Sequence, residues 1–271
     1  MLKASVIIST YNLPNYLKLV LNALKDQDVS DFEIIIADDG SKPDTRALIA
    51  DMQPNFPIAL HHVWQDDIGF RVATIRNKAA AISKGEYLIF IDGDCIPLTN
   101  FVRRHIALAE KNWFISGKRS FANKRFTNLV LANKVSDIHK FTLWQLFRLC
   151  CNHYCNRFFS FIYLPFNKIR KIRPTKWKGA QTCNLAVWKS DFIAINGFDE
   201  IYNGWGYEDS DLVIRLIRNG TFRKNGNYAT SIVHLWHEAN DKSSILRNKT
   251  LLNEILKSNR IRAKIGMDQY I

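Results

Sequence analysis

The chain has 271 residues, 47% of them apolar, which is enough to bury one full α/β core. Thirty-eight Lys and Arg outnumber 25 Asp and Glu, and the formal net charge is +13. No stretch approaches the roughly 18 to 20 consecutive apolar residues of a membrane-spanning helix, and residues 4–8 read as a strand with no charged and apolar leader before them. We therefore expect a cytoplasmic protein.

The five cysteines are odd in number and sparse, which favours reduced thiols over a disulfide framework. A zinc site in the run 150–155 is the alternative, but its ligands are crowded and no second ligand pair of usual spacing follows. The cysteines are Cys95, Cys150, Cys151, Cys155 and Cys183.

The whole charge excess lies in segment 118–178, which holds fourteen Lys or Arg and one acid, Asp137. The remainder holds 24 basic and 24 acidic residues. The middle of the segment is also rich in Phe, Tyr and Trp. Basic and aromatic residues together favour a surface that meets anionic lipid or polymer, but a helical insert with an aromatic core and a solvated basic face would show the same pattern.

Apolar runs and helical patterns alternate along the first 91 residues. The patterns predict strands at 6–9, 32–37, 58–64 and 87–91, with helices that begin at Pro14, span 43–52, and span 72–84 with Gly85 at the C-cap. Nearly continuous apolar strands between helices are typical of a parallel sheet covered on both faces. Such sheets bind ligands beyond the carboxyl ends of their strands.

Polar residues follow three of the predicted strands. They are Thr10-Tyr11-Asn12, Asp38-Asp39 and Asp92-Gly93-Asp94. No glycine-rich phosphate loop of the dinucleotide or Walker type follows the first strand. In the last group two hard oxygen ligands flank a glycine that lets a phosphate come close, which suits a divalent ion bridging a diphosphate. A chance acidic turn is the alternative, and the position after a buried strand favours the ion site.

A second acidic cluster occupies residues 203–211. Glu208, Asp209 and Asp211 begin a predicted helix, where acids are also ordinary partners of the helix dipole. The glycine and aromatic residues before them suggest a sugar ring held against Trp205.

These motifs, in this order and spacing, resemble family 2 glycosyltransferases of the GT-A fold, over residues 4–117 and 177–240. The block 196–206 also resembles β-1,4-galactosyltransferases and chondroitin-polymerase modules. The resemblance implies an α/β fold with a mainly parallel nucleotide-binding sheet flanked by helices. Residues 1–240 would form the GT-A domain, with the basic, aromatic-rich helical insert 118–178, and 241–271 a helical extension. Its helix is predicted at 241–265.

The resemblance also implies how the chain binds its donor, a UDP-sugar. Thr10 and Tyr11 would line the pocket for the base and ribose, and Asp39 would hydrogen-bond one of them. Arg76 would hold the nucleotide or its diphosphate.

A divalent cation, Mn²⁺ or Mg²⁺, is implied as cofactor. Asp92 would reach the ribose or a metal-bound water, and Asp94 would bind the metal directly. Either His234 or His237 would complete the site. His61 and His62 are interpreted as structural or exposed, because no carboxylate lies within metal-ligand spacing on their strand.

For the chemistry, Asp209 is expected to be the catalytic base, Glu208 to position substrate hydroxyls, and Trp205 to stack on a sugar. One base and one metal imply a single inverting displacement. The product would be a glycan or glycolipid such as a bacterial surface polysaccharide or lipopolysaccharide, extended by a hexose (galactose, glucose or their N-acetylamino forms). The stretch 118–176 has no counterpart in the resemblance, and acceptor recognition is expected there.

Two other functions fit parts of the sequence. A nucleotidyltransferase on a related fold would also use paired acids and a metal, but would carry a Gly-rich basic loop after the first strand. A basic, non-catalytic polyanion-binding protein fits the charge, although no nucleic-acid-binding motif is present and we expect no nucleic-acid partner.

An anionic membrane surface is a further expected partner of the glycosyltransferase, which would place the enzyme peripherally on the inner face of the membrane.

Overall fold

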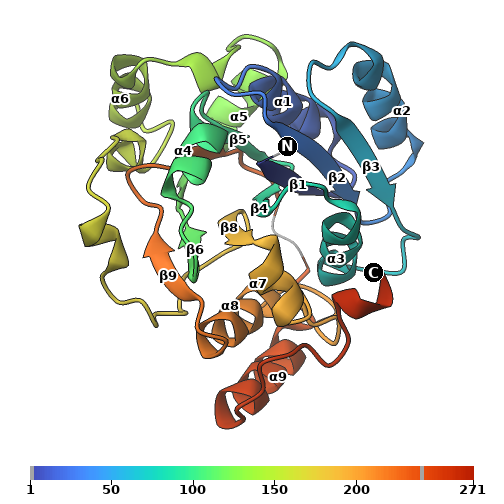
Figure 1. The fold of residues 1–271 in the computed structure, drawn as a ribbon. Coiled ribbons are helices and arrows are strands. Elements are labelled where there is room, and N and C mark those ends of the chain that lie inside the picture. The colour runs from blue at the N-terminus through green and yellow to red at the C-terminus, as the bar shows by residue number, and fades with distance from the viewer. Residues whose placement is uncertain (1–2, 239–240) are drawn as a thin grey trace.

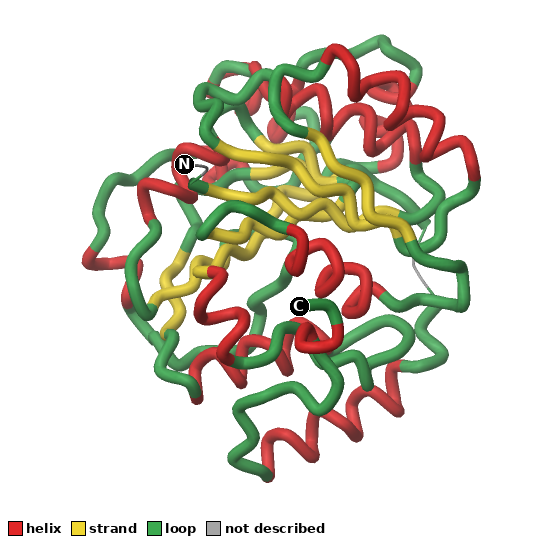
Figure 2. The backbone as a smooth tube through the Cα atoms, turned by 45° about the vertical axis from the view of Figure 1, so that its right-hand side comes forward, coloured by secondary structure: helices red, strands yellow, loops and turns green. Residues whose placement is uncertain are grey.

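A computed structural model describes residues 3–238 and 241–271, and its centre is a seven-stranded sheet with helices on both faces (Figures 1 and 2). One strand, β8, runs antiparallel to its two neighbours, and the other pairs are parallel. In sheet order the strands are β3 (Leu60–Trp64), β2 (Phe32–Asp38), β1 (Ala4–Thr10), β4 (Tyr87–Asp92), β8 (Asn184–Trp188), β6 (Trp113–Ser116) and β9 (Phe222–Asn225). The prediction of a mainly parallel sheet flanked by helices is confirmed.

Alternate side chains of the strands enter two separate cores, because successive residues of a strand point to opposite faces. Val6 and Ile8 pack with the first core and Ile7 with the second. Helices α1 (Pro14–Lys25), α2 (Pro43–Met52) and α4 (Phe101–Leu108) cover the first face. Helices α3 (Val72–Ile82), α7 (Lys189–Ala194) and α8 (Glu208–Arg218) cover the second.

Gly85 is not the C-cap of α3, as the sequence had suggested. The helix ends at Ile82 with Ser83 as its cap, two residues earlier than predicted. A Cβ at Gly85 would lie 2.4 Å from the carbonyl carbon of Ala4, so glycine is required there by the close approach of β1. The predicted strand at 58–64 likewise begins only at Leu60.

A second, three-stranded sheet joins distant parts of the chain. Its order is β5 (Cys95–Pro97), β10 (Ile232–His234) and β7 (Arg119–Phe121). The antiparallel register of β10 and β5 sets His234 opposite Cys95. This pairing carries the late histidines of the chain to the carboxyl end of β4.

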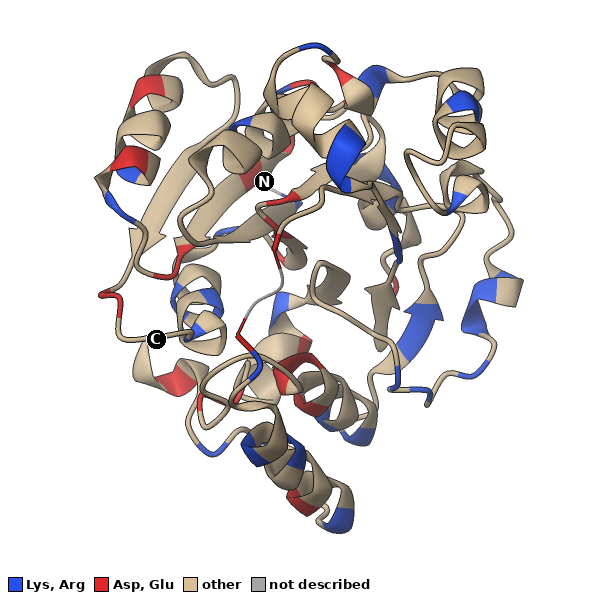
Figure 3. Ribbon diagram, turned by 180° about the vertical axis from the view of Figure 1, so that it is seen from behind, with Lys and Arg blue, Asp and Glu red and all other residues tan. Residues whose placement is uncertain are grey.

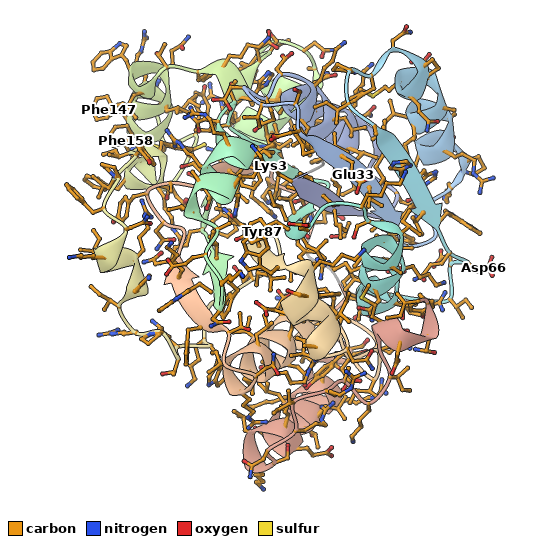
Figure 4. All side chains as sticks on the ribbon, in the orientation of Figure 1. Lys3, Glu33, Asp66, Tyr87, Phe147 and Phe158 are labelled. Carbon is orange, nitrogen blue, oxygen red and sulfur yellow. The ribbon has the colours of Figure 1, made fainter. Side chains whose placement is uncertain are left out.

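The insert 118–178 is not purely helical, because it begins with β7. It continues with α5 (Lys124–Leu131) and α6 (Leu143–Cys151) and then with short 3-10 turns. Some of its aromatic residues are packed as in a folded insert, and others are exposed as on a surface that meets anionic lipid or polymer. Phe158 packs on the first core and meets the half-exposed Phe147 at 5.1 Å between ring centroids (Figure 4). Trp144, Phe159 and Phe166 remain 60 to 69% exposed.

The C-terminal helix is shorter than predicted, since α9 spans Ile245–Lys257 rather than 241–265. After it, the Arg260 guanidinium pairs with the buried carboxylates of Asp199 and Asp211 and ties the tail to the second face of the sheet. All five cysteines are free. Within the described residues, no helix has the length and apolar character needed to cross a bilayer.

Candidate active site

The carboxyl ends of β1, β2 and β4 lie side by side, as the parallel register requires. The Asp39 amide donates to the Thr10 carbonyl at 3.0 Å, and the Ser9 hydroxyl donates to Asp92 Oδ1 at 2.9 Å. The three polar segments predicted at strand ends therefore meet at one edge of the sheet.

Asp39 is held rigidly at this edge. Its carboxylate accepts the Gln65 side-chain amide at 2.6 Å and the Arg71 backbone N–H at 2.8 Å. Burial raises the pKa of Asp39 to about 6, against these hydrogen bonds, which lower it. Beside it, Tyr11 is 45% exposed and its hydroxyl donates to Asp67 at 2.8 Å. The Thr10 hydroxyl is buried without a hydrogen-bond partner among the described residues.

Arg76 connects the first acidic motif to the second. The side chain is almost fully buried, and its Nη2 donates to Asp92 Oδ1 at 2.9 Å. Its Nη1 lies 3.6 Å from Glu208 Oε1 and 3.7 Å from Asp209 Oδ1. One guanidinium thus holds carboxylates from β4 and α8, which are more than 100 residues apart in the chain.

Gly93 is packed rather than open. A Cβ built there would lie 3.1 Å from Thr10 Oγ1 and 3.2 Å from the Ser9 carbonyl oxygen. The space that the missing side chain leaves is therefore taken by β1, and the glycine lets β1 and β4 end close together. The expectation that it makes room for a phosphate finds no support in this contact.

Asp94 forms a cluster with both candidate histidines. His237 Nε2 lies 2.9 Å and His234 Nε2 3.6 Å from Asp94 Oδ2, and one ligand atom from each residue lies within 4.8 Å of the others. Although burial acts to raise it, the pKa of Asp94 is lowered by the hydrogen bond from His237 and the charges of both histidines. The donor set of one carboxylate and two imidazoles suits Mn²⁺ better than Mg²⁺, which prefers oxygen ligands.

The ring of His237 is oriented for such a role. Its Nδ1 lies 2.6 Å from the Glu238 carbonyl oxygen, a contact in which only the nitrogen can donate. With a proton held on Nδ1, loss of the Nε2 proton that His237 donates to Asp94 would leave the Nε2 lone pair free for a cation.

Glu208 and Asp209 begin α8 after a turn through Tyr207, whose φ of 73° is left-handed. Thr182 fixes Asp209, because its hydroxyl donates to Oδ1 at 2.5 Å and its backbone N–H to Oδ2 at 3.2 Å. Burial raises the pKa of Asp209, and burial with the Asp209 charge raises that of Glu208 to about 8. The helix N-terminus alone does not keep these carboxyls at their usual pKa.

Trp205 is half-buried in the loop before α8, and the Lys242 ammonium lies 5.6 Å from its ring centre. The buried Asn248 of α9 donates to the carbonyls of Gly204 and Trp205 at 3.2 and 3.5 Å. The C-terminal helix, to which the sequence assigned no chemistry, therefore anchors this loop.

The remaining acid of the second motif has a structural role. Asp211 is fully buried, and Arg215 Nε donates to it at 2.6 Å. His61 and His62 each face a carboxylate of neighbouring β2 and none on their own strand: His62 Nε2 lies 2.9 Å from Asp38 Oδ2. Among the described residues, the cysteine run 150–155 forms no group with metal-ligand geometry.

Sequence reasoning missed three residues of the site: Thr182, Asn248 and Arg119, whose Nη1 lies 4.0 Å from Asp92 Oδ2. None belongs to a motif, and each reaches the site only through the packing of distant segments. Thr182, two residues before β8, offered one weak signal, since polar residues at the amino end of an antiparallel strand meet the carboxyl end of its neighbour β4.

Comparison with known proteins identifies the family. The family model for glycosyl transferase family 2 matches residues 5–195, and a model described as the N-terminal domain of galactosyltransferase matches residues 167–238. Validoxylamine A glucosyltransferase of Streptomyces hygroscopicus subsp. jinggangensis is 28% identical over 233 residues, 80% of this chain and 51% of that protein. Chondroitin synthase of Escherichia coli is 26% identical over 230 residues, 80% of this chain and 32% of that protein. The chain thus spans about half or less of these relatives.

Solved structures agree on the fold. S. aureus TarS 1-349 in complex with UDP-GlcNAc superposes with a TM-score of 0.63 at 16% identity, covering 99% of this chain and 69% of that one. The mannosyltransferase PcManGT of Pyrobaculum calidifontis, in complex with GDP-Man and Mn²⁺, gives a TM-score of 0.61 at 15% identity, over 94% and 64%. These likenesses and the mainly parallel sheet confirm the GT-A fold. With most of its length matched by the family model, the chain belongs to glycosyltransferase family 2.

Proposed function

We propose that this chain is a metal-dependent, inverting glycosyltransferase that moves a hexose from a UDP-sugar to a hydroxyl of a glycan or glycolipid. The observation that carries the proposal is the Arg76 contact between Asp92 and the Glu208–Asp209 pair. It brings the acids expected near the donor diphosphate next to the acids expected near the acceptor. A transferase requires both groups at one point.

The donor end has the chemistry of a nucleoside pocket. The exposed Tyr11 ring offers a stacking surface for a base, and the unpartnered Thr10 hydroxyl offers a hydrogen bond. Asp39 would accept from the base or ribose, which compensates its buried charge. TarS is known in complex with UDP and UDP-GlcNAc, which supports the same donor class here.

Asp94, with His237 and His234, would hold the divalent cation. When bound, the ion neutralises charge that develops on the leaving diphosphate. Asp92 would remain with Arg76 and Ser9 and reach a ribose or a metal-bound water. PcManGT is known in complex with GDP-Man and Mn²⁺, which supports a divalent cation as a partner of this fold.

Asp209 would take the proton of the acceptor hydroxyl as that oxygen attacks the anomeric carbon. Its two bonds from Thr182 fix the carboxylate, and its raised pKa makes it a stronger base than a solvated aspartate. Burial and the Asp209 charge raise the pKa of Glu208 to about 8, and in its neutral form Glu208 is suited to donate a hydrogen bond to a substrate oxygen. Trp205 would stack on a sugar. A single base, without a second carboxylate to act as nucleophile, would give transfer by one displacement with inversion.

We divide the chain into a catalytic domain, residues 1–240, and a C-terminal extension, 241–271, which packs against that domain.

We further propose that the acceptor is a bacterial surface polysaccharide or lipopolysaccharide precursor, met at the inner face of the membrane. The exposed Trp144, Phe159 and Phe166 of the basic insert support a peripheral contact, at about 1 kcal/mol for each engaged Lys or Arg. Sedimentation with vesicles of anionic lipid should be strong at low salt and weaken as salt rises. Absence of co-sedimentation at low salt contradicts membrane docking.

The decisive experiment is a donor screen. Thermal unfolding is followed with UDP-sugars and GDP-mannose, with and without Mn²⁺, and release of UDP or GDP is then measured with the stabilising donor. We expect metal-dependent stabilisation and slow UDP release. Pyrophosphate formation from a nucleoside triphosphate would favour the nucleotidyltransferase alternative. Binding of polyanions without any nucleotide-sugar turnover would favour the non-catalytic one.

A further inference from the structure

A cavity of about 630 Å³ lies between the insert and the loop that follows β9. Lys118, His153, Arg157, Phe158, Asn227 and Tyr228 are among the residues that line it. Of its lining residues, only Phe159 has been given a role above, in the proposed membrane contact. It lies beyond the ends of β6 and β9, which run parallel to β4, and so at the same edge of the sheet as the candidate active site.

Two short chains of contacts join the cavity to the candidate site. Arg157 Nη1 donates to the Arg119 carbonyl at 3.4 Å, and Arg119 Nη1 lies 4.0 Å from Asp92 Oδ2. The Arg157 guanidinium also lies 5.5 Å from the centre of the Phe121 ring, which lies 5.2 Å from the ring of His234. In the first chain of contacts Arg119 of β7 lies between the cavity and Asp92, and in the second Phe121 of β7 lies between the cavity and His234.

The lining of the cavity is positively charged without compensation. No Asp or Glu lines it, and Lys118 and Arg157 form no ion pair within the described residues. Across the whole insert, only three of the fourteen Lys and Arg form an ion pair with a carboxylate in the described part of the chain. Lys and Arg recur along this side of the molecule (Figure 3). Cations of one sign around a concave surface focus a field that attracts anions.

The cavity also carries groups that suit a sugar. Asn227 Oδ1 is buried and has no hydrogen-bond donor among the described residues, so a ligand hydroxyl would satisfy it. Tyr228 and Phe158 offer rings against which a sugar face can pack.

We propose that this cavity binds the acceptor, and that the acceptor is an anionic glycan whose carboxylate or phosphate is held by Lys118 and Arg157. That the bound glycan is the acceptor rests on the proposed function. That the glycan is anionic rests on the cavity alone. Lys118 and Arg157 bind the charged substituent, and Asn227 and Tyr228 contact the sugar that bears it.

Titration calorimetry at low salt tests the ligand class with three oligosaccharides of equal length. One carries a carboxylate on alternate sugars, the second is the same molecule with its carboxyl groups reduced to alcohols, and the third carries phosphate monoesters. We expect one of the anionic oligosaccharides to bind at least tenfold more tightly than the neutral one, and the tighter of the two identifies the charged substituent. Equal affinity for all three, or no binding, overturns the proposal.

Paired charge-removing variants test the location. Lys118→Gln with Arg157→Gln should weaken anionic binding tenfold or more, which corresponds to about 1.4 kcal/mol. Lys134→Gln with Lys168→Gln removes the same charge from exposed residues of the insert outside the cavity and should weaken it less than about threefold. Equal losses in both pairs would mean a diffuse electrostatic effect and would overturn the cavity assignment.

Donor hydrolysis separates this proposal from the one above. UDP release in the absence of acceptor should be unchanged in the Lys118→Gln and Arg157→Gln pair. If no nucleotide sugar is hydrolysed by any variant while anionic binding keeps its dependence on Lys118 and Arg157, the proposed function fails and the anionic glycan site stands. If hydrolysis occurs and anionic binding is absent, the proposed function stands and the anionic glycan site fails.

Discussion

Replacing Asp209 with Asn tests the catalytic assignment most directly. The exchange keeps the shape of the side chain, and its remaining oxygen can still accept from the Thr182 hydroxyl. It removes the group that would take the acceptor proton. Loss of general-base assistance costs 10²- to 10⁴-fold in rate, or roughly 3 to 5 kcal/mol of barrier. We expect transfer to fall by that factor.

Donor binding and stability should behave differently from the rate. Asp92 keeps its bond to Arg76 in the variant, so affinity for the donor with metal should change less than about threefold. Because burial raises the pKa of Asp209, the fold stabilises the neutral form relative to the charged one. The neutral Asn should therefore leave the free energy of unfolding at pH 8 equal to or above that of the wild type. The variant should be folded, bind donor and hardly turn over.

The assay is single-turnover transfer followed by UDP release, with calorimetric donor binding and urea unfolding on the same samples. Thr182→Val is a matched control, because it deletes the hydroxyl bond to Asp209 but leaves the carboxylate, and a loss of about tenfold is expected. Near wild-type transfer by Asp209→Asn with an inactive Glu208→Gln would exchange the two roles. If neither change affects transfer, the acids only cap α8 and the mechanism is refuted.

Three other outcomes follow from the same contacts. Asp94→Ala should abolish metal-dependent binding of nucleotide sugar, and unchanged UDP affinity with Mn²⁺ by calorimetry would contradict the metal site. Since the pKa of Glu208 is raised from 4.5 to about 8, the folded chain holds more protons than the unfolded chain between those pH values. The free energy of unfolding of the wild type should therefore fall relative to that of Glu208→Gln as pH rises from 5 to 8, by at most about 1.4 kcal/mol per pH unit. The same pH dependence of urea unfolding in both proteins would contradict the raised pKa. Arg260→Leu leaves Asp199 and Asp211 with less compensation and should cost about 3 kcal/mol in chemical denaturation, whereas a loss below about 1 kcal/mol would mean that the other partners suffice.

The sequence by itself determined the β-α alternation of the first half and the edge at which the acids lie. Strands such as 87–91 are continuously apolar, and that pattern is typical of a sheet with both faces buried. The carboxyl ends of parallel strands share one edge, so Asp39 and Asp92 could be placed near each other from strand order alone. Helix ends were predicted less well, as at Gly85, where close contact with β1 rather than capping requires glycine.

Only the tertiary structure decided which distant residues complete the site. Pairing of β10 with β5 brings His234 and His237 to Asp94, and no local pattern in the sequence encodes that register. The position of Arg76 between two acidic motifs, and of Thr182 against Asp209, depends likewise on side-chain packing across the sheet. The pKa values of the acids also lay beyond the sequence, because desolvation depends on what surrounds a carboxyl in three dimensions, not on its neighbours along the chain.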